Sequence, residues 1–374
     1  MFLYLFQKSI CLRISNLLEE DISYWAIVSS SKHVVEKYIN ILGFSGSMEK
    51  ITFLGEDKLN QFSNILKKKL TGFFPSGSKV AVKLHMGEEG NNYYLKPDFV
   101  KKVIDALKEL NLKPFLFDSP VMYGGERDSV EKYYKTAEKH GFKDICPIVI
   151  SNESVGVKTK HLDAEVCKQI YESENMLVLS HVKGHSCAGF GATIKNLGMG
   201  GVSKKTKKDI HAGGGPIIQD NCNACGICAE ACSNGAITIQ DKAVCNHDSC
   251  WGCSICYYLC PNKAIKVKNA TFDVLLAESA MASIKNMKKV FYVNVLMNIA
   301  KHCDCWSNEN EIVLDDIGVL LGKDMVAIDK ASLDLINKKA GKDLFEEIHK
   351  KSPRYHIEAA SKLGIGSLAY RLEK

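Results

Sequence analysis

The sequence contains no apolar run of the roughly 18–20 residues that a helix needs to cross a bilayer. Its first residues, Met-Phe-Leu-Tyr-Leu-Phe, are interrupted by Gln7, Lys8 and Arg13, and no basic segment precedes them as it would in a secretory signal peptide. No stripe of basic residues interleaved with aromatic ones occurs, and the net charge of +6 is modest for 374 residues. We therefore expect a cytoplasmic protein that binds neither membrane nor nucleic acid.

Two nucleotide-binding signatures are also missing. No phosphate-binding P-loop pattern occurs, and Gly189-Phe-Gly191 fails as a dinucleotide-binding turn because Ile194 stands where the third glycine would be. Gly189 and Gly191 are more simply read as glycines that allow tight packing near a site. As cofactor-binding candidates, they would let the backbone come close to a bound molecule.

Apolar runs and helical stripes alternate along most of the chain, which is long enough for two or three domains. This β-α-β-α order predicts an α/β fold with a mostly parallel sheet and flanking helices. The expected strands are 48–54, 80–84, 114–117, 147–150, 176–179, 290–296 and 311–319. The expected helices include 97–110, 127–140 and 325–336, and we expect the chain to end in helices.

The predicted domain organisation has one α/β domain interrupted by a small insert. Residues 1–47 show no clear period, and we expect them to be an extension upstream of a translation start at Met48. Residues 48–216 form the first part of the α/β domain and residues 269–374 the second part with the C-terminal helices. Between them, residues 217–268 form a small α+β insert of ferredoxin type.

Nine of the fifteen cysteines lie between Cys222 and Cys260, at ligand spacings. Two C-x2-C-x2-C-x3-C runs match the bacterial ferredoxin pattern, in which the fourth cysteine of each run ligates the other 4Fe–4S cluster. We assign the first cluster to Cys222, Cys225, Cys228 and Cys260. The second is assigned to Cys250, Cys253, Cys256 and Cys232. A zinc site would leave the third and fourth cysteines of each run unused.

The flanks of these runs fit the same interpretation. Each run is followed by a β-type segment, Ala236–Ile239 or Ala264–Val267, as expected for two pseudo-symmetric halves. Ser233 replaces the usual proline after the first run. Cys245 fits neither run and is expected to be a small buried hydrophobic residue.

Three further candidates surround the glycine-rich stretch 184–201. His185, Lys195 and His211 are predicted to line one pocket beside the insert, because open α/β sheets bind ligands beyond their strand ends. His211 would end a basic loop, 204–208, and fold over the site as part of a lid. The lysines of that loop could attract an anionic substrate, but a solvated run is the simpler reading.

His302, Cys303 and Cys305 lie within four residues after a predicted strand. Two thiols and an imidazole so close together could hold a further metal ion or form a redox pair. Two inert thiols at a loop are the alternative.

Several ordered motifs between about Val80 and Asn337 resemble the uncharacterised "Fe–S center" proteins, the domain of unknown function 362 family. The resemblance implies the fold and the iron–sulfur cofactors but no reaction. The matching stretches are Val82–Glu88, Pro114–Asp118, Tyr123–Arg127, His181–His185, Gly189–Gly191, Lys195–Gly200, Cys303–Cys305, Asp316–Gly318 and Val326–Asp329.

A second, fainter resemblance is to the nickel-pincer lactate racemases. Those enzymes have a histidine, Ala-Gly-Phe, a cofactor-bearing lysine and another histidine. Here His185 precedes Ala188-Gly-Phe190, and Lys195 and His211 follow. The cysteine-rich insert and the continuation Asn196-Leu-Gly-Met-Gly200 depart from that family, so the resemblance implies a shared scaffold rather than a nickel cofactor.

The sequence thus predicts an electron-transfer protein with two 4Fe–4S clusters beside an oxidoreductase-type site that includes His185, Lys195 and His211. A redox partner protein and a small-molecule substrate would be its partners. Two alternatives stay open: a non-redox assembly or sensing protein with structural clusters, and a racemase-like enzyme on the α/β scaffold.

Overall fold

The computed structural model describes residues 48–307 and 310–373. The elements below belong to one compact unit, Glu49–Lys374. The predicted extension 1–47 lies outside the described residues. None of the helices in the described part is long and apolar enough to cross a membrane.

An eight-stranded sheet has the order β18-β1-β17-β14-β7-β2-β3-β4. Only β17 runs against its neighbours, and every other adjacent pair is parallel. The predicted α/β class with a mostly parallel sheet is therefore confirmed. The strands are β1 (Glu49–Gly55), β2 (Lys79–Lys83), β3 (Lys113–Asp118), β4 (Ile148–Ile150), β7 (Asn175–His181), β14 (Lys289–Leu296), β17 (Gly318–Gly322) and β18 (Tyr370–Glu373).

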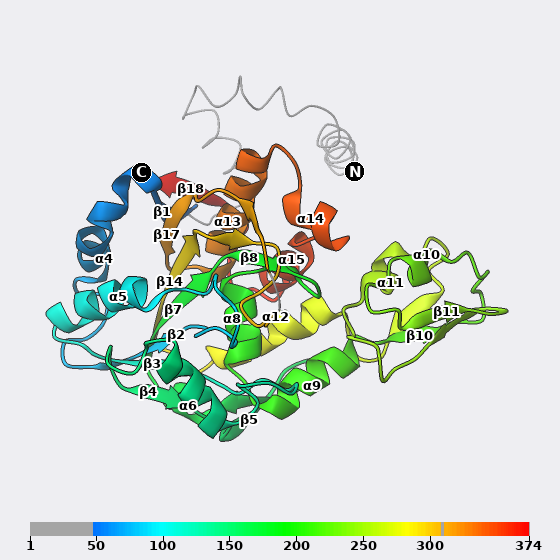
Figure 1. Ribbon diagram of the computed structural model, residues 1–374, viewed down its shortest axis with the longest axis horizontal. Helices are drawn as coiled ribbons and strands as arrows, with labels where there is room; N and C mark the ends of the chain where they lie inside the picture. Colours follow the sequence, from blue (N-terminus) through cyan, green and yellow to red (C-terminus); the bar gives the residue numbers. More distant parts are fainter. Residues whose placement is uncertain (1–47, 308–309, 374) are drawn as a thin grey trace, which may run out of the picture. The chain divides into compact units, whose positions relative to one another are not determined.

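Both faces of the sheet are covered by helices (Figure 1). Along β7, Met176 and Val178 enter one core while Leu177 and Leu179 enter the other, because side chains alternate along a strand. One face packs on α4 (Phe62–Leu70), α5 (Pro97–Glu109) and α6 (Val130–Lys139). The other packs on α8 (Thr193–Gly200), α12 (Phe272–Ser283), α13 (Met325–Ala340) and α15 (Arg354–Lys362).

The remaining elements of the α/β part are short connections. They are η1 (Glu56–Gln61), α7 (Lys168–Tyr171), α14 (Leu344–His349), and the paired strands β5 (Ser154–Lys158) with β6 (Asp163–Cys167), β8 (Lys183–His185) with β9 (Gly189–Gly191), and β15 (Ile299–Ala300) with β16 (Ile312–Leu314).

The cysteine-rich segment has its own elements and its own small core. In antiparallel pairs, β10 (Pro216–Ile218) joins β13 (Ile265–Val267), and β11 (Ile237–Ile239) joins β12 (Ala243–Cys245). Two short helices, α10 (Ile227–Glu230) and α11 (Ile255–Leu259), complete it. Its core consists of Cys228, Ile237, Ala243, Cys256 and Ile265.

The predicted basic loop 204–208 is wrong, because these residues begin helix α9 (Lys204–Gly213). The Ser203 side chain accepts a hydrogen bond from the Thr206 amide and so caps the helix, while lysine is a good helix former. Lys207 is buried rather than solvated.

Two other expectations need correction. The single strand 311–319 is two strands, β16 and β17, separated by residues 315–317, and β17 begins at Gly318, whose φ of 135° favours glycine. The chain does not end in helices alone, since β18 returns to the sheet and pairs in parallel with β1.

Candidate functional site

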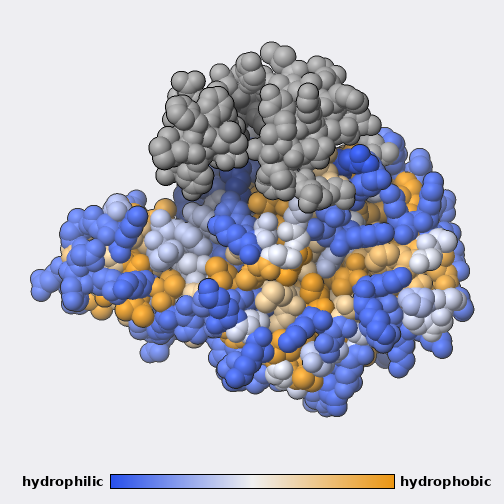
Figure 2. Space-filling view, turned by 180° about the vertical axis from the view of Figure 1, so that it is seen from behind, coloured by the Kyte–Doolittle hydropathy of each residue, from blue (hydrophilic) through white to orange (hydrophobic). Residues whose placement is uncertain are grey.

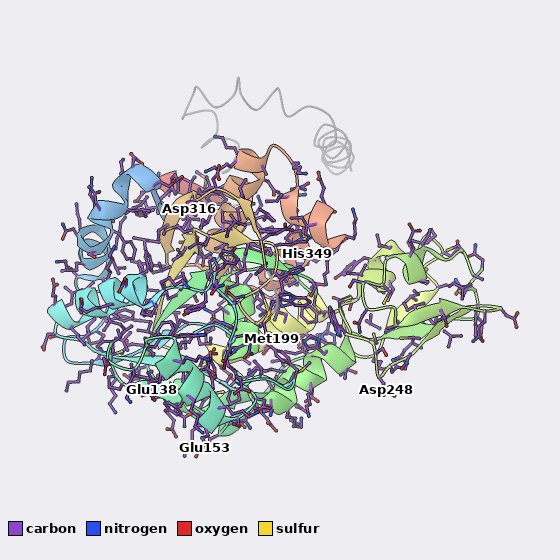
Figure 3. All side chains as sticks on the ribbon, viewed as in Figure 1. Glu138, Glu153, Met199, Asp248, Asp316 and His349 are labelled. Carbon is purple, nitrogen blue, oxygen red and sulfur yellow. A yellow bond between two sulfur atoms is a disulfide. The ribbon has the colours of Figure 1, made fainter. Side chains whose placement is uncertain are left out.

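A cavity of about 820 Å³ lies at the carboxyl ends of β2 and β3, between the α/β part and the cysteine-rich segment. His185, Lys195 and His211 all line it, so the structure brings the three predicted site residues together. Figure 3 marks two further lining residues, Met199 on α8 and Asp248 on the cysteine-rich segment. The chemical roles of these residues stay predictions.

Lys83 and Asp118 form a buried ion pair on the floor of this cavity. Lys83 ends β2 and Asp118 ends β3, and the Nζ–Oδ1 distance is 3.0 Å. Lys83 also donates to Asn196 Oδ1 at 2.7 Å, and the Tyr133 hydroxyl donates to the second carboxylate oxygen of Asp118. Burial lowers the pKa of Lys83, and the Asp118 carboxylate opposes that shift.

We predict that Tyr133→Phe lowers the free energy of unfolding by about 1–2 kcal/mol. The variant loses a buried hydroxyl that donates a hydrogen bond to Asp118 and accepts one from the Met86 amide. Tyr134→Phe is the matched control, since its hydroxyl sits at the exposed surface and water can replace its hydrogen bonds. Urea unfolding of both variants checks this. Equal losses in the two would contradict a special role for the Asp118 contact.

Arg127 forms the second buried pair, with Nε 3.0 Å from Glu88 Oε2. Its Nη1 donates to His85 Nε2 at 2.8 Å, and the Gly87 amide points at the other ring nitrogen at 3.1 Å. Burial, followed by the Arg127 charge, holds the pKa of His85 well below its usual value. His85 is therefore a neutral ring, and because arginine can only donate, its accepting nitrogen is Nε2.

The two predicted histidines are held in opposite tautomers. His185 Nδ1 accepts from the Cys187 and Ala188 amides at 3.1 and 3.3 Å, so the neutral ring carries its proton on Nε2. His211 Nδ1 lies 2.7 Å from the Trp251 carbonyl, which only accepts, so this ring keeps Nε2 unprotonated. Burial lowers the pKa of both. One histidine can thus donate a proton and the other can accept one.

His211 is not part of a lid. It lies in α9 and its hydrogen bond to Trp251 joins the helix to the cysteine-rich segment. A side chain on Gly252 would meet the His211 carbonyl oxygen at 1.6 Å, so this contact requires glycine. The helix that replaced the expected loop explains the difference.

Gly189 and Gly191 do not line the cavity. Gly189 has φ of 75°, and a side chain there would meet the Lys351 carbonyl oxygen at 2.7 Å. At Gly189 the close backbone approach is thus made by the chain itself and not by a bound molecule.

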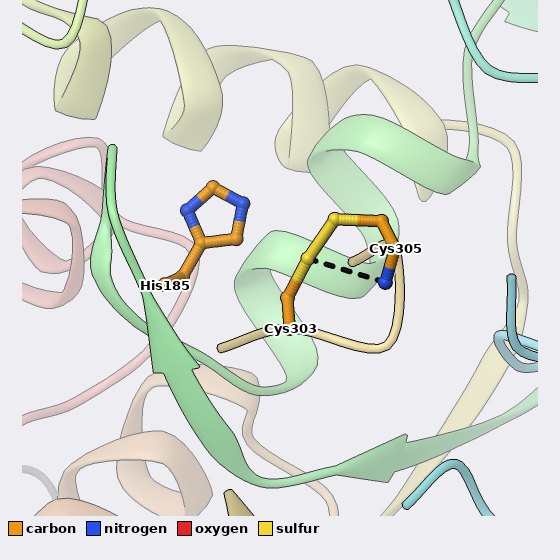
Figure 4. A group of neighbouring side chains, drawn as sticks. All are labelled: His185, Cys303 and Cys305. Carbon is orange, nitrogen blue, oxygen red and sulfur yellow. Dashed lines mark hydrogen bonds between the residues drawn. A yellow bond between two sulfur atoms is a disulfide. The ribbon is translucent and has the colours of Figure 1, made fainter. Parts of the chain in front are cut away.

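His185, Cys303 and Cys305 form a compact group in which one ligand atom of each lies within 4.8 Å of the others (Figure 4). Such a group can hold a metal ion when the cysteines are thiolates. In this structure Cys303 and Cys305 are joined by a disulfide. Figure 4 shows the edge of the His185 ring turned toward the two sulfur atoms.

A buried charge network positions this group. Asp304, between the two cysteines, lies 2.8 Å from His181 Nδ1 and 2.8 Å from Lys183 Nζ. These two partners hold the pKa of Asp304 below its usual value even though burial opposes the shift. Gly184 lets the loop approach, because a side chain there would meet the Lys301 carbonyl oxygen at 2.0 Å.

Lys195 differs from the other cations of the site because its ammonium has no hydrogen-bond or ion-pair partner in the described part of the chain. Burial, then the positive charges of Lys183 and Arg127, lower the pKa of Lys195 to about 7. The side chain comes from the first turns of α8, whose N-terminus is capped by the Asp329 carboxylate at 2.9 and 2.8 Å.

The eight predicted cluster cysteines form no disulfides, and the fold of their segment groups them. A small cavity is lined by Cys222, Cys225, Cys228 and Cys260, the four residues assigned to one cluster. Burial and then the neighbouring Cys253 and Cys250 raise the pKa of Cys256.

Cys245 is not the buried residue that the sequence suggested. It lies half-buried in β12, and burial followed by neighbouring Cys250 raises its pKa.

Sequence reasoning missed several residues of the cavity. A general signal was available, because ligand sites in open α/β sheets lie beyond the carboxyl ends of the strands. This signal could have identified Lys83, His85 and Asp118, which end or closely follow strands. Only the tertiary structure shows that Arg127, Lys207 and Trp306 also line the cavity.

A sequence model of the family described as "Domain of unknown function (DUF362)" matches residues 80–334, more than half of the chain. The chain belongs to the DUF362 family. This confirms the first resemblance, and the matched range contains the whole cavity and the cysteine-rich segment. No curated protein matches this DUF362 chain.

Two solved structures are similar to this DUF362 protein at 11% identity. A Thermotoga maritima protein from a structural genomics consortium has a TM-score of 0.42, with 83% of this chain and 61% of that one covered. The lactate racemase apoprotein from Thermoanaerobacterium thermosaccharolyticum has a TM-score of 0.32, with 67% and 51% covered. The chain thus spans about three fifths and one half of these two proteins.

Proposed function

We propose that this DUF362 protein is an iron–sulfur oxidoreductase in which two 4Fe–4S clusters serve a reaction site in the 820 Å³ cavity. The observation that carries the proposal is that the cluster segment forms one wall of this cavity. Cys250 and Trp251 line it together with Cys305 and His185 of the α/β part. When bound, such clusters supply one-electron transfer.

The cysteine-rich segment fits two clusters on its own geometry. Backbone amides point at the sulfur of the last cysteine in each run, Ala236 at Cys232 at 3.3 Å and Ala264 at Cys260 at 3.2 Å. Hydrogen bonds of this kind stabilise thiolate ligands and tune cluster potentials. The same spacing in both halves supports the pseudo-symmetric assignment, Cys222, Cys225, Cys228 and Cys260 for one cluster and Cys250, Cys253, Cys256 and Cys232 for the other.

A redox partner protein is part of the proposal. Figure 2 shows apolar side chains at the surface of the lobe formed by the cysteine-rich segment. Among its large apolar residues, Ile217, Ile227, Ile239, Val244, Tyr257 and Leu259 are exposed. Exposed apolar residues rimmed by polar ones support docking of another protein.

The Cys303–Cys305 pair supports a redox reaction where the α/β part lines the cavity. Opening this disulfide takes up two electrons and two protons and leaves two thiols. His185 presents its Nε2 proton toward the sulfurs and is suited to deliver one proton. A metal ion at the same place would require that proton to leave, so the tautomer favours thiol chemistry over a metal site.

Titanium(III) citrate, a one-electron donor, tests this proposal. After anaerobic reduction and alkylation, we expect the peptide with Cys303 and Cys305 to carry two alkyl groups. In Cys250→Ser, reduction of the Cys303–Cys305 disulfide should slow by about tenfold or more. The cluster assigned to Cys250, which lies beside the cavity, would be lost and could no longer pass electrons to the disulfide. Cys146→Ser, outside both runs, is the control.

An unchanged rate in Cys250→Ser would overturn the coupling. Nickel or zinc bound in a one-to-one ratio and lost in Cys303→Ser would instead favour a metal enzyme, the candidate function that the His185, Cys303 and Cys305 group supports.

A further inference from the structure

Two ion pairs line the cavity, Lys83–Asp118 at 3.0 Å and Arg127–Glu88 at 3.0 Å. A third pair, Lys183–Asp304 at 2.8 Å, lies near Lys195 without lining the cavity. Two other lysines line it without a carboxylate partner, Lys195 and Lys207. The Lys207 ammonium is satisfied by the chain, since it donates to the Ser119 hydroxyl at 2.7 Å and to the Ser119 and Pro120 carbonyls. Lys195 is thus the one unpaired cation among these five.

The surroundings of Lys195 make an unpaired ammonium unfavourable. It is half-buried and lies in the field of Lys183, Arg127 and Lys83, and the nearby Asp304 is already held by His181 and Lys183. A charge that is partly removed from water and has no partner of opposite sign is unfavourable. An anion that enters the cavity would remove this cost.

The rest of the cavity is suited to an organic body rather than to a small inorganic ion. Val121, Met122, Met199, Trp251 and Trp306 all line it. A volume of about 820 Å³ lies in the range of small-molecule sites, which combine apolar walls with a few polar groups.

A carboxylate fits the remaining donor better than a phosphate does. Phosphate sites commonly use backbone amides at a helix N-terminus. The Thr193 and Ile194 amides at the start of α8, the helix that carries Lys195, already donate to the Asp329 carboxylate. One ammonium without such amides matches a singly charged group.

We propose that the cavity binds an organic carboxylate with an apolar body, and that Lys195 is the residue that holds its carboxylate group. This names the substrate class of the proposed function. It places the carboxylate end at α8 and the apolar body among Val121, Met122, Trp251 and Trp306.

The test measures binding by calorimetry on the anaerobic, cluster-loaded protein at pH 6.5, with naphthoate, its neutral isostere naphthamide, and naphthyl phosphate as probes. We expect naphthoate to bind about tenfold more tightly than naphthamide, as for a charge-assisted hydrogen bond. Lys195→Met should remove this preference and leave naphthamide binding within about twofold. Lys208→Met, an exposed lysine of α9, should behave as the parent.

Equal binding of naphthoate and naphthamide by the parent would overturn the proposal, as would a preference that survives in Lys195→Met or the absence of saturable binding by naphthoate. Tighter binding of naphthyl phosphate would overturn the choice of carboxylate. Because no electron donor is present and iron is measured separately, a failure here is distinct from a failure of the iron–sulfur function.

Discussion

Cys253→Ser is expected to lose about four of about eight iron atoms per chain, because one of two 4Fe–4S clusters loses a ligand. The loss should be local, since the cysteine-rich segment has a core of its own, separate from the two cores of the sheet. Iron and sulfide analysis after anaerobic purification measures it, with circular dichroism as a check on folding. Cys146→Ser, a cysteine outside the segment, should retain the parent's iron.

The same experiment tests the crossed ligation. Cys225→Ser and Cys260→Ser should lose the same cluster although they belong to different runs, because both residues line one small cavity. Their reduced proteins should show the same residual paramagnetic resonance signal, different from that of Cys253→Ser. If the signal of Cys260→Ser matches that of Cys253→Ser instead, each run holds its own cluster. Parent-level iron in all three variants would refute the cluster assignment.

Lys195→Met is expected to stabilise the protein at pH 6.5, by about 2–4 kcal/mol in the free energy of unfolding. The folded pKa of Lys195 is lowered to about 7 from its ordinary value of 10.5, mainly by burial. Below pH 7 both states bind the proton, so the full cost of the buried charge is present. Between about pH 7 and 10.5 the unfolded state binds more protons than the folded one, so stability rises with pH in this window.

Removing the lysine should therefore help most at low pH, and the advantage of Lys195→Met should shrink by pH 9.5. Urea unfolding at the two pH values measures this, and Lys208→Met should change stability by less than about 0.5 kcal/mol at both. An equal effect at pH 6.5 and 9.5 would contradict the lowered pKa. A gain in stability would also show that any loss of naphthoate binding in this variant is not caused by unfolding, and would fit a residue retained for binding at a cost in stability.

Local sequence patterns determined the sheet strands and the cysteine runs. The strands β2, β3 and β7 were readable because they are buried on both faces and are therefore continuous apolar runs. The helix α5 was readable from its apolar stripe and from proline at its first position. The cysteine spacing was readable because cluster ligation requires thiolates at fixed intervals in one loop.

Only the tertiary structure decided how these parts meet. Lys83, Arg127 and Cys305 are far apart in the chain, and no local pattern shows that they line one cavity. The helix at Lys204 depended on a serine cap, and the position of β18 depended on a free edge at β1, so both were misread from composition alone. The tautomers of His185 and His211 and the unpaired state of Lys195 depend on which backbone groups and charges lie within a few ångströms. Distances between distant segments set those electrostatic properties, and sequence patterns carry no information about them.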